Sequence, residues 1–255
     1  MAIAVNTWAE FLVAYESADD TVIELMADLD ANDNLPKTSY SRPVAKTING
    51  NGHTIYNIST GAVVSTPIFR AGSTYALVLN NTNFYNCYRI ENQPIFWSSD
   101  SARPQFNDCK IVGRGLQFIA QRATFQRCSF SWSGTTASDA GSALSFYNSW
   151  VKIDHTRAAN SSSAFLGTLN NSYIEGSIAQ EATGTFNFKI ANNLDSSVIN
   201  IETSATNTTF PSGTTSIYNS TKQPNFTDSG NCVGVTDAQM KNAAYLQGIG
   251  FNIVI

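Results

Sequence analysis

Two carboxylates in the second half of the sequence have the spacing that a catalytic pair would need if the chain coiled regularly. Asp154 and Glu175 are 21 residues apart. Paired carboxylates act as general acid, general base or nucleophile in polysaccharide cleavage. Solvated surface acids are the alternative interpretation, which we favour, so we predict no catalytic residue. The remaining acids between residues 101 and 200 are Asp108, Asp139, Glu181 and Asp195.

An acidic segment near the start has oxygen ligands at alternate positions, as calcium-binding loops do. Asp28, Asp30 and Asn32 match the first ligand positions of an EF-hand loop. That loop also requires glycine at its sixth position and glutamate at its twelfth, where this chain has Asp33 and Ser39. We therefore predict no metal site here and interpret the segment as an acidic turn.

The two histidines and the one glycine-rich turn lack the sequence context of a catalytic or phosphate-binding motif. His53 follows Gly50-Asn-Gly52, and His155 lies far from any cysteine or serine triad pattern. We interpret both histidines as hydrogen-bonded turn or loop residues. The glycines fit neither the dinucleotide-binding nor the P-loop pattern. Four cysteines and two histidines have the wrong spacing for a zinc module, and we predict no cofactor.

Three of the four cysteines share a local sequence. Cys87, Cys109 and Cys128 each follow a phenylalanine by three positions. We interpret them as small buried side chains that stack on one another. A disulfide between neighbouring coils is the alternative, because such coils lie within the distance that a disulfide spans. The sequence leaves the redox state of these thiols open.

The same pattern continues with serine in place of cysteine, and this reveals a repeat. The steps between successive small residues range from 19 to 25 and average about 22. The members of the series are Cys87, Cys109, Cys128, Ser149, Ser172, Ser197 and Ser220.

The internal order of the repeat predicts a bend. A large apolar residue three positions before a small one cannot share its face in a regular strand, because strand side chains alternate. Asparagine or aspartate precedes the small residue in five of the seven repeats, and both tolerate the left-handed conformation. We therefore predict two strands joined by a one-residue bend. The residues before the small position in those five repeats are Asn86, Asp108, Asn148, Asn171 and Asn219.

Another apolar residue usually follows the small one by two positions, and we expect it to be buried. In the first repeat Arg89 occupies this place, so either the strand bulges there or Arg89 points outward. The apolar residues of the other repeats are Ile111, Phe130, Val151, Ile174 and Ile199.

A repeat of this length with β-bends is typical of a parallel β-solenoid. Leucine-rich repeats have a similar period, but their LxxLxLxxN pattern is absent. We predict an all-β, single-stranded right-handed parallel β-helix of about nine or ten rungs. We expect residues 1–255 to form one domain, with rungs over 21–235 between an N-terminal cap at 1–20 and a C-terminal cap at 236–255.

The N-terminal cap begins with a capping box, Thr7-Trp-Ala-Glu10, followed by apolar residues at helical spacing. We expect a helix of roughly ten residues that covers the first rung and protects its sheet edge. Val22–Met26 is the predicted first strand, and Ile48–Ile55 supplies a strand and a turn of the next rungs.

The C-terminal cap has a second capping box, Thr236-Asp-Ala-Gln239. It predicts a short helix to about Leu246 that Gly248 can stop. The segment Gly250–Ile255 is expected to close the fold as a strand.

Composition excludes several classes of protein. Only 13% of residues are charged and the net charge is −4, which argues against nucleic acid as the main partner. No apolar run approaches the roughly 20 residues of a membrane helix, so we expect no membrane association. The N-terminus lacks the basic and apolar regions of a signal peptide, and we predict none. The charge is uneven, because residues 1–36 hold eight acids and residues 70–127 hold seven of the 15 bases.

Four segments together resemble a known group, the pectate-lyase-like right-handed β-helix proteins. They are Trp8-Ala-Glu-Phe11, Ile23-Glu-Leu-Met-Ala-Asp-Leu-Asp30, Lys46-Thr-Ile-Asn-Gly-Asn-Gly-His-Thr-Ile55, and the ending from Val235 to Leu246 with Gly250-Phe251. The likeness is greatest to phage-encoded virion members. It implies the fold directly, whereas the function is less constrained because this fold serves enzymes, adhesins and virion proteins.

The resemblance leads to three functional hypotheses. The first is a non-enzymatic phage virion protein, such as a capsid decoration, head-fibre or tail-associated protein, located in the virion after assembly in the host cytoplasm. Its partners would be other virion proteins, further copies of itself, in a homotrimer by analogy, and a host surface glycan. The second hypothesis is a small polysaccharide depolymerase or lyase, which would require stacked acids in a groove lined with aromatics. The third is a bacterial surface adhesin, which would require an export signal.

Overall fold

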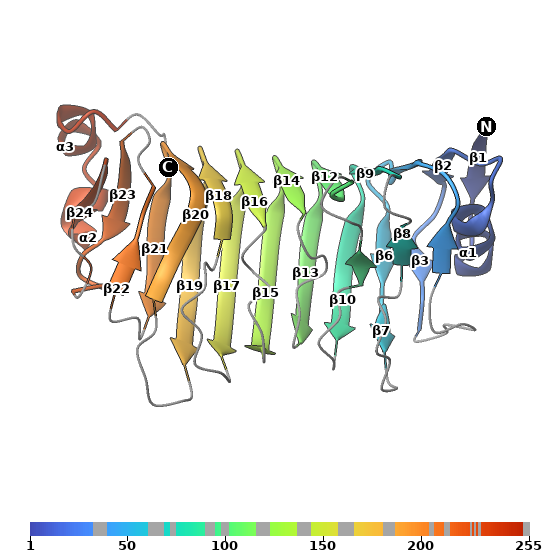
Figure 1. Ribbon diagram of the computed structural model, residues 1–255, viewed down its shortest axis with the longest axis horizontal. Coiled ribbons are helices and arrows are strands. Elements are labelled where there is room, and N and C mark those ends of the chain that lie inside the picture. The colour runs from blue at the N-terminus through green and yellow to red at the C-terminus, as the bar shows by residue number, and fades with distance from the viewer. Residues whose placement is uncertain are drawn as a thin grey trace. The chain divides into compact units, whose positions relative to one another are not determined.

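The computed structural model of the chain falls into two compact units, Met1–Gly134 (unit 1) and Thr135–Ile255 (unit 2), which are described separately. Strands dominate both units (Figure 1). The structure describes residues 1–32, 40–60, 69–71, 75–89, 95–97, 102–115, 123–136, 144–157, 166–180, 187–203, 207–211, 215–224, 226, 228 and 231–251.

Unit 1 is a coil of parallel strands with three sides. On each side a strand pairs in register with its counterpart in the next rung, as Ile48 does with Leu79. The first side contains β1 (Ala2–Val5), β2 (Val22–Leu25), β5 (Lys46–Asn49), β9 (Leu77–Asn80), β12 (Gln105–Asn107) and β14 (Thr124–Gln126). The second contains β3 (Leu29–Asp30), β6 (Thr54–Tyr56), β7 (Ser59–Thr60), β10 (Asn83–Arg89), β13 (Lys110–Gly115) and β15 (Ser129–Thr136). The third contains β4 (Tyr40–Arg42), β8 (Phe69–Ala71) and β11 (Phe96–Trp97).

Unit 2 repeats the first two sides of this plan. Its longest pairing joins β17 and β19 over eight residues in register, from Trp150 opposite Tyr173 to Arg157 opposite Gln180. The first side contains β16 (Ser145–Tyr147), β18 (Leu166–Asn170), β20 (Asn187–Asp195) and β22 (Asn207–Thr209). The second contains β17 (Trp150–Arg157), β19 (Tyr173–Gln180), β21 (Val198–Thr203), β23 (Ser216–Asn219) and β24 (Cys232–Val235).

The predicted parallel β-helix is confirmed. Among the described residues the first side has six strands in unit 1 and four in unit 2. The number of rungs in the whole chain stays a prediction. Within each unit, all strand pairings between described residues are parallel, as expected when successive turns of a coil stack on one another.

A one-residue bend joins the first side to the second, as the repeat predicts. Asp108, Asn148 and Asn171 have positive φ angles of 55°, 49° and 44°. Arg127 and Ser196 adopt the same conformation at 53° and 44°, although neither residue type favours it. The position in the coil therefore overrides the local preference of these two residues. The apolar residues expected beyond the bend, Ile111, Phe130, Val151, Ile174 and Ile199, are all fully buried.

The predicted alignment of the first repeat is wrong. Phe84 lies opposite Ile111, beyond the bend, and Leu79 lies opposite Phe106. The buried Thr82, and not Cys87, therefore occupies the position of Cys109. Asn86 nevertheless has the predicted positive φ, at 52°. The pairing of β10 with β13 shifts register between Phe84 and Cys87, which confirms the bulge considered for this strand; the side chain of Arg89 lies outside the described residues.

The alignment of the last repeat is also wrong. Val198 lies opposite Ile217, so Ser216 follows Ser197 in the series and Ser220 does not. Asn219 is not a bend, because it belongs to β23 and is completely buried. The residues that stack inside the bends are Thr82, Cys109 and Cys128 in unit 1 (the unit 1 ladder) and Ser149, Ser172, Ser197 and Ser216 in unit 2 (the unit 2 ladder).

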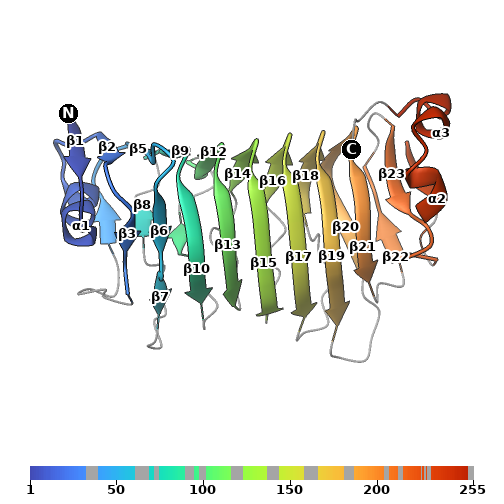
Figure 2. The same cartoon turned by 180° about the vertical axis from the view of Figure 1, so that it is seen from behind.

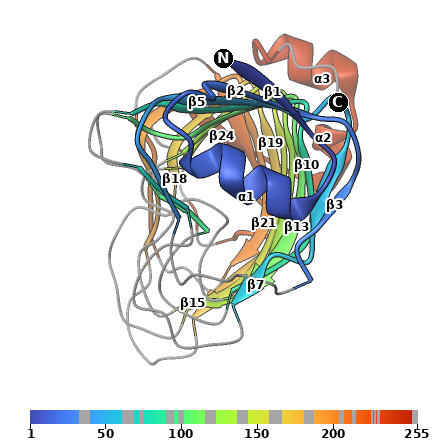
Figure 3. The same cartoon turned by 90° about the vertical axis from the view of Figure 1, so that its right-hand side faces the viewer.

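The N-terminal cap contains more than the predicted helix. The helix α1 (Trp8–Glu16) begins at the predicted capping box of Thr7 and Glu10 and lies across the end of the coil (Figure 3). It is preceded by β1, which pairs with β2, so Val22–Met26 is not the first strand. β1 forms because alternate residues of Ala2–Val5 can continue the sheet face of β2.

Aromatic packing and one buried lysine hold α1 in place. Phe11 and Tyr15 contact Phe69 with ring centroids 6.0 and 4.9 Å apart. The Lys46 ammonium donates to the carbonyl oxygens of Ala14 and Ser17, at 2.8 and 2.6 Å, and also to that of Asp20. It thus caps the carbonyl end of the helix, where a positive charge is favourable. Burial lowers the pKa of Lys46.

The C-terminal cap confirms the second capping box at Thr236 and Gln239 but not a continuous helix. α2 (Asp237–Met240) ends at Lys241, and α3 (Ala243–Gly248) starts again with the Asn242 side chain as its N-cap. Leu246 and Phe251 pack on Val198, Ile217 and Val235, which closes the core of unit 2. Most of the predicted closing strand lies outside the described residues.

Candidate functional site

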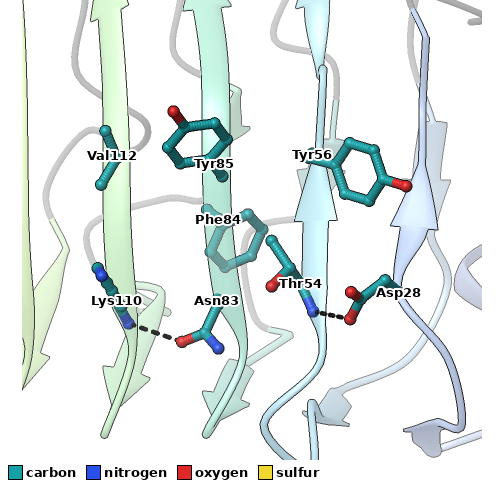
Figure 4. Close-up of a pocket in the computed structure, with 8 residues that line it drawn as sticks. All are labelled: Asp28, Thr54, Tyr56, Asn83, Phe84, Tyr85, Lys110 and Val112. Carbon is teal, nitrogen blue, oxygen red and sulfur yellow. Dashed lines mark hydrogen bonds between the residues drawn. The ribbon is translucent and has the colours of Figure 1, made fainter.

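The outer face of the second side of unit 1 carries a shallow hollow of about 340 Å³ (Figure 4). It crosses neighbouring strands β6, β10 and β13, with β3 at its N-terminal rim (Figure 2). We call it the tyrosine groove and define it by its lining residues. They are Asp28, Thr54, Tyr56, Asn83, Phe84, Tyr85, Lys110 and Val112.

Strand alternation places these side chains. Tyr56 lies opposite Tyr85 in the sheet, and both point outward because the residues before them, Ile55 and Phe84, are buried in the core. Tyr85 is 59% exposed, an unusually high value for so large a side chain. Two aromatic rings on adjacent rungs thus stand on the outer face, at a strand spacing of about 4.8 Å.

One rim of the groove is acidic and fixed by hydrogen bonds. Oδ1 of Asp28 accepts the backbone N–H of Thr54 at 2.8 Å and lies 3.3 Å from Nδ1 of His53. The carboxylate side chain remains 57% exposed. Asp28 therefore has a defined position and still presents negative charge to a ligand or partner.

The opposite rim is basic. Lys110 is exposed, and its backbone N–H donates to Oδ1 of Asn83 at 3.3 Å. The Asn83 amide in turn donates to the Gly52 carbonyl at 2.8 Å, so this side chain is held from both ends. The groove therefore offers a carboxylate, two phenol rings and an ammonium group in sequence along the coil, an arrangement suited to binding.

The acidic segment that resembled a calcium loop is engaged in other contacts. Oδ1 of Asp30 accepts the N–H of Asn32 and the Nδ2–H of Asn57, both at 2.9 Å. Asp28 instead contacts His53 and Thr54 at the start of β6. Asp33 and Ser39 lie outside the described residues. Over the part of the chain that the structure describes, no three His, Cys, Asp or Glu side chains gather as metal ligands would.

The glycine-rich turn forms backbone hydrogen bonds to the next rung. The N–H groups of Gly50 and Gly52 donate to the carbonyl oxygens of Asn80 and Asn81 at 2.8 and 2.9 Å. A Cβ atom on Gly50 would lie 2.3 Å from the Asn81 oxygen, so only glycine fits there. His53 closes this turn as its N–H donates to the Gly50 carbonyl at 2.8 Å. The interpretation of His53 as a turn residue agrees with these contacts.

The structure brings Asp154 and Glu175 to the same outer face of neighbouring strands, β17 and β19, but not opposite each other. Lys152 pairs with Glu175, and Asp154 pairs with Ser177. Oδ1 of Asp154 accepts the N–H of Ser177 at 3.0 Å and its hydroxyl at 3.3 Å, and Oδ2 lies 3.9 Å from Nζ of Lys152. These contacts fix the Asp154 carboxylate in the sheet.

Four further candidate residues remain, and the structure describes the side chain of one of them, Asp195. His155 lies within β17 and not in a loop as predicted, and its side chain is outside the described residues, as are Asp139 and Glu181. Asp195 ends β20 and accepts hydrogen bonds from the Asn170 and Asn193 amides.

All four cysteines are described, buried and outside any disulfide. In the unit 1 ladder the Sγ atoms of Cys109 and Cys128 lie 3.2 and 3.4 Å from the carbonyl oxygens of Asn107 and Gln126. Burial raises the pKa of Cys87 to about 12. The hydrogen bond with Cys128, together with burial, raises the pKa of Cys109. The interpretation of these thiols as small packed side chains agrees with their burial.

The tyrosine groove was not predicted from the sequence. Tyr56 and Tyr85 are 29 residues apart, outside the range of the repeat steps, so the spacing of the small residues gave no reason to pair them. A usable signal was the placement of each tyrosine directly after a core residue, Ile55 or Phe84. Because strand side chains alternate, a tyrosine next to a core residue points away from the core.

Comparisons with known proteins bear on the fold and on the first half of the chain. Residues 2–124, just under half of the 255, match the family described as "Putative pectate lyase-like adhesive domain". No curated protein matches the sequence. A crystal structure of a putative immunoglobulin A1 protease from Bacteroides ovatus is similar at a TM-score of 0.46 and 11% identity, covering 97% of this chain and 87% of that one. No described helix has the length and apolar character needed to span a membrane.

Proposed function

We propose that this chain is a non-catalytic β-helical attachment protein. The observation that carries the proposal is the match of residues 2–124 to a pectate-lyase-like adhesive domain family. That segment includes every residue of the tyrosine groove. An exposed aromatic pair flanked by charges suits adhesion, because aromatic rings give large contact area at low entropic cost.

The contacts of the carboxylates support a binding role over turnover. Asp154 is hydrogen-bonded to Ser177, and Asp28 is hydrogen-bonded to Thr54. Each carboxylate thus accepts a backbone N–H group of the neighbouring strand and stabilises the contact between the two strands. A catalytic pair needs its two carboxylates to flank the bond that is cleaved, whereas Glu175 lies opposite Lys152 and Asp154 lies opposite Ser177.

As the finer proposal, the protein acts in a phage virion, as a capsid decoration, head-fibre or tail-associated protein assembled in the host cytoplasm. The support is the resemblance of its opening and closing segments to phage-encoded β-helix proteins. Its partners would be other virion proteins and a host surface glycan. The described residues 1–32 hold seven acids and no lysine or arginine, so the N-terminal end can dock on a basic partner surface.

A binding and cleavage assay tests this function. Full-length protein is mixed with phage particles, with host cells and with purified host polysaccharide, and bound protein and released oligosaccharide are both measured. We expect particle attachment without oligosaccharide release. A chain that starts at residue 21, without β1 and α1, should attach less and be less soluble, because β2 becomes an open edge. Attachment to host cells but not to particles would instead support the bacterial adhesin.

The second candidate function, a polysaccharide depolymerase, is favoured by the groove itself. Its lining combines aromatics, the carboxylate of Asp28 and the ammonium of Lys110. Oligosaccharide release that disappears in Asp28→Asn would place an active site in the groove and overturn the attachment proposal. Release that disappears in Asp154→Asn or Glu175→Gln would place it on β17 and β19 with the same consequence.

A further inference from the structure

Charge changes sign along unit 1 from the first rungs to the later ones. Described residues 1–32 contain seven acids and no lysine or arginine. The described residues from 102 to 134 contain four bases and one acid, and that acid, Asp108, is paired with Arg127 at 2.7 Å. The tyrosine groove lies where the sign changes, with Asp28 on its acidic rim and Lys110 on its basic rim.

We propose that the tyrosine groove is a self-association surface that binds a second copy of this chain in antiparallel orientation about a two-fold axis. The axis lies in the plane of the interface, runs parallel to the strands and passes between β6 and β10. It sets the acidic rim at β3 of one copy against the basic rim at β13 of the other. This interface goes beyond the proposed function, which requires attachment but specifies no contact between copies.

The two-fold arrangement follows from the charge order. In a two-fold interface the same patch meets itself, so the patch must be self-complementary. Reversing the order of strands β3, β6, β10 and β13 places Asp28 near the partner's Lys110, and Lys110 near the partner's Asp28. Both junctions then join opposite charges, and the two-fold axis relates one junction to the other.

A parallel trimer, which the virion resemblance implies, fits this face less well. When coils pack side by side in the same direction, each rung meets the same rung of its neighbour. Acidic rungs then face acidic rungs and basic rungs face basic ones, and like charges at an interface cost several kcal/mol. The antiparallel pair avoids that repulsion at both ends of the groove.

The centre of the patch has the composition of an interface core. Tyr85 is 59% exposed, and Tyr56 and Val112 are partly exposed beside it. Tyrosine is among the residues that contribute most to binding energy when buried at the centre of an interface, with charged residues at the rim. The order Asp28, Tyr56, Tyr85, Lys110 along the coil matches that plan (Figure 4).

Analytical ultracentrifugation of the full-length protein over a concentration series tests the proposal. We expect a monomer–dimer equilibrium that weakens as salt rises, because the rim charges are screened. Lys110→Glu and Asp28→Lys should each weaken the dimer by roughly tenfold or more, since each creates two like-charge junctions. Asp28→Asn, whose amide oxygen can still accept the Thr54 N–H, should weaken it less. Lys241→Glu makes the same charge change at an exposed site in unit 2 and serves as the matched control.

A mixture of the two charge variants gives the decisive measurement. In a two-fold dimer of Lys110→Glu with Asp28→Lys, one junction joins the two substituted side chains, which again carry opposite charges, and the other joins the two native residues. The mixture should therefore form heterodimers at close to the native affinity, although neither variant dimerises well alone. This recovery also excludes misfolding as the cause of the single-variant losses.

Three results would overturn the inference. The first is a native protein that stays monomeric at every concentration, and the second is a trimer. The third is a dimer that the charge variants and Tyr85→Ala leave unchanged. A groove that binds purified glycan while the protein stays monomeric would assign it to a glycan instead. Attachment to particles through the acidic N-terminal end does not require the groove to be free or occupied, so this inference and the proposed function can fail separately.

Discussion

The two ladders occupy the same place in the rung, and they differ because unit 1 has cysteine at two positions where unit 2 has serine throughout. In the unit 2 ladder the hydroxyls of Ser149, Ser172 and Ser197 donate to the carbonyl two residues earlier at 2.8, 2.8 and 2.7 Å. Ser172, Ser197 and Ser216 also accept the N–H of the serine in the preceding rung, each at 3.1 Å. A hydroxyl can do both at once because it is donor and acceptor.

In the unit 1 ladder the thiols contact carbonyl oxygens of two rungs. Sγ of Cys109 lies 3.5 Å from the Leu79 oxygen, and Sγ of Cys128 lies 3.3 Å from the Phe106 oxygen. A thiol is a weak donor and packs as a small hydrophobe. Thr82 in the same ladder has a hydroxyl, which donates to the Asn80 carbonyl at 3.0 Å as the unit 2 serines do. The comparison shows that the bend requires a small buried side chain, and that either a thiol or a hydroxyl can fill the place.

The largest expected effect comes from a charge in the unit 1 ladder. Cys109→Asp should destabilise unit 1 by about 3–5 kcal/mol, because the carboxylate would be buried without a partner or forced to take up a proton. Denaturant unfolding measures the loss. The exposed Gln126→Asp is the control, with an expected change within about 0.5 kcal/mol. Equal losses at the two sites would contradict the assigned burial of the ladder.

A smaller loss is expected from Ser172→Ala in the unit 2 ladder. The change removes the acceptor of the Ser149 N–H and the donor to the Asn170 carbonyl, both in a buried site. Leaving such groups unsatisfied costs about 1–3 kcal/mol.

Ser172→Cys tests the difference between the ladders, because it places a thiol, as at Cys109 and Cys128, in a serine position of unit 2. Its free energy of unfolding, measured with denaturant, should lie between those of the wild type and the alanine variant. If the Ser172→Cys variant is as stable as the wild type, the hydrogen bonds of the Ser172 hydroxyl make no net contribution to the free energy of unfolding.

A gain of roughly 0.5 kcal/mol is expected from Ser196→Asn. Ser196 adopts a φ of 44°, which asparagine tolerates better than serine. In the preceding bends the Asn171 amide donates to Oδ1 of Asn148 at 2.6 Å, and an asparagine at 196 can extend that stack. Thermal unfolding measures the gain, with Ser220→Asn outside the ladder as the control; a lower melting temperature for Ser196→Asn would contradict it.

The smallest expected effect is a pH dependence of stability, which we expect for the bends of unit 1 and not for those of unit 2. The Arg127 guanidinium, through its hydrogen bonds at 2.7 Å, holds the pKa of Asp108 below its usual value. A carboxyl whose pKa is depressed on folding contributes stability above its unfolded pKa of about 3.9 and loses it as pH falls through the folded value. Both groups are exposed, so the contribution is small.

NMR titration of the Asp108 carboxyl should give a pKa below that of an unfolded aspartate, and Arg127→Gln should restore the ordinary value. The amide stack of Asn148 and Asn171 in unit 2 has no titrating group and should not respond. An unchanged Asp108 pKa in Arg127→Gln would mean that the ion pair does not form in solution.

The sequence determined the coil, the bends and most of the buried positions. A bend between a large apolar residue and a small one can be recognised from residue types, because only a few residues accept positive φ and only small ones fit inside. For that reason Asp108, Asn148 and Asn171 were predicted correctly, and so were Ile111 and Ile174 beyond them. Both capping boxes were recognised for a similar reason, since their contacts are local.

Only the tertiary structure decided the register at the two ends and the groove. The rung before Phe106 contains two segments of similar pattern, Leu79–Thr82 and Phe84–Cys87, and pairing with β12 and β13 selects the first. Strand pairing is a contact between distant residues, so no local pattern fixes it. The groove depends on the same pairing, because residues 28, 56, 85 and 110 share one outer face only after neighbouring strands align.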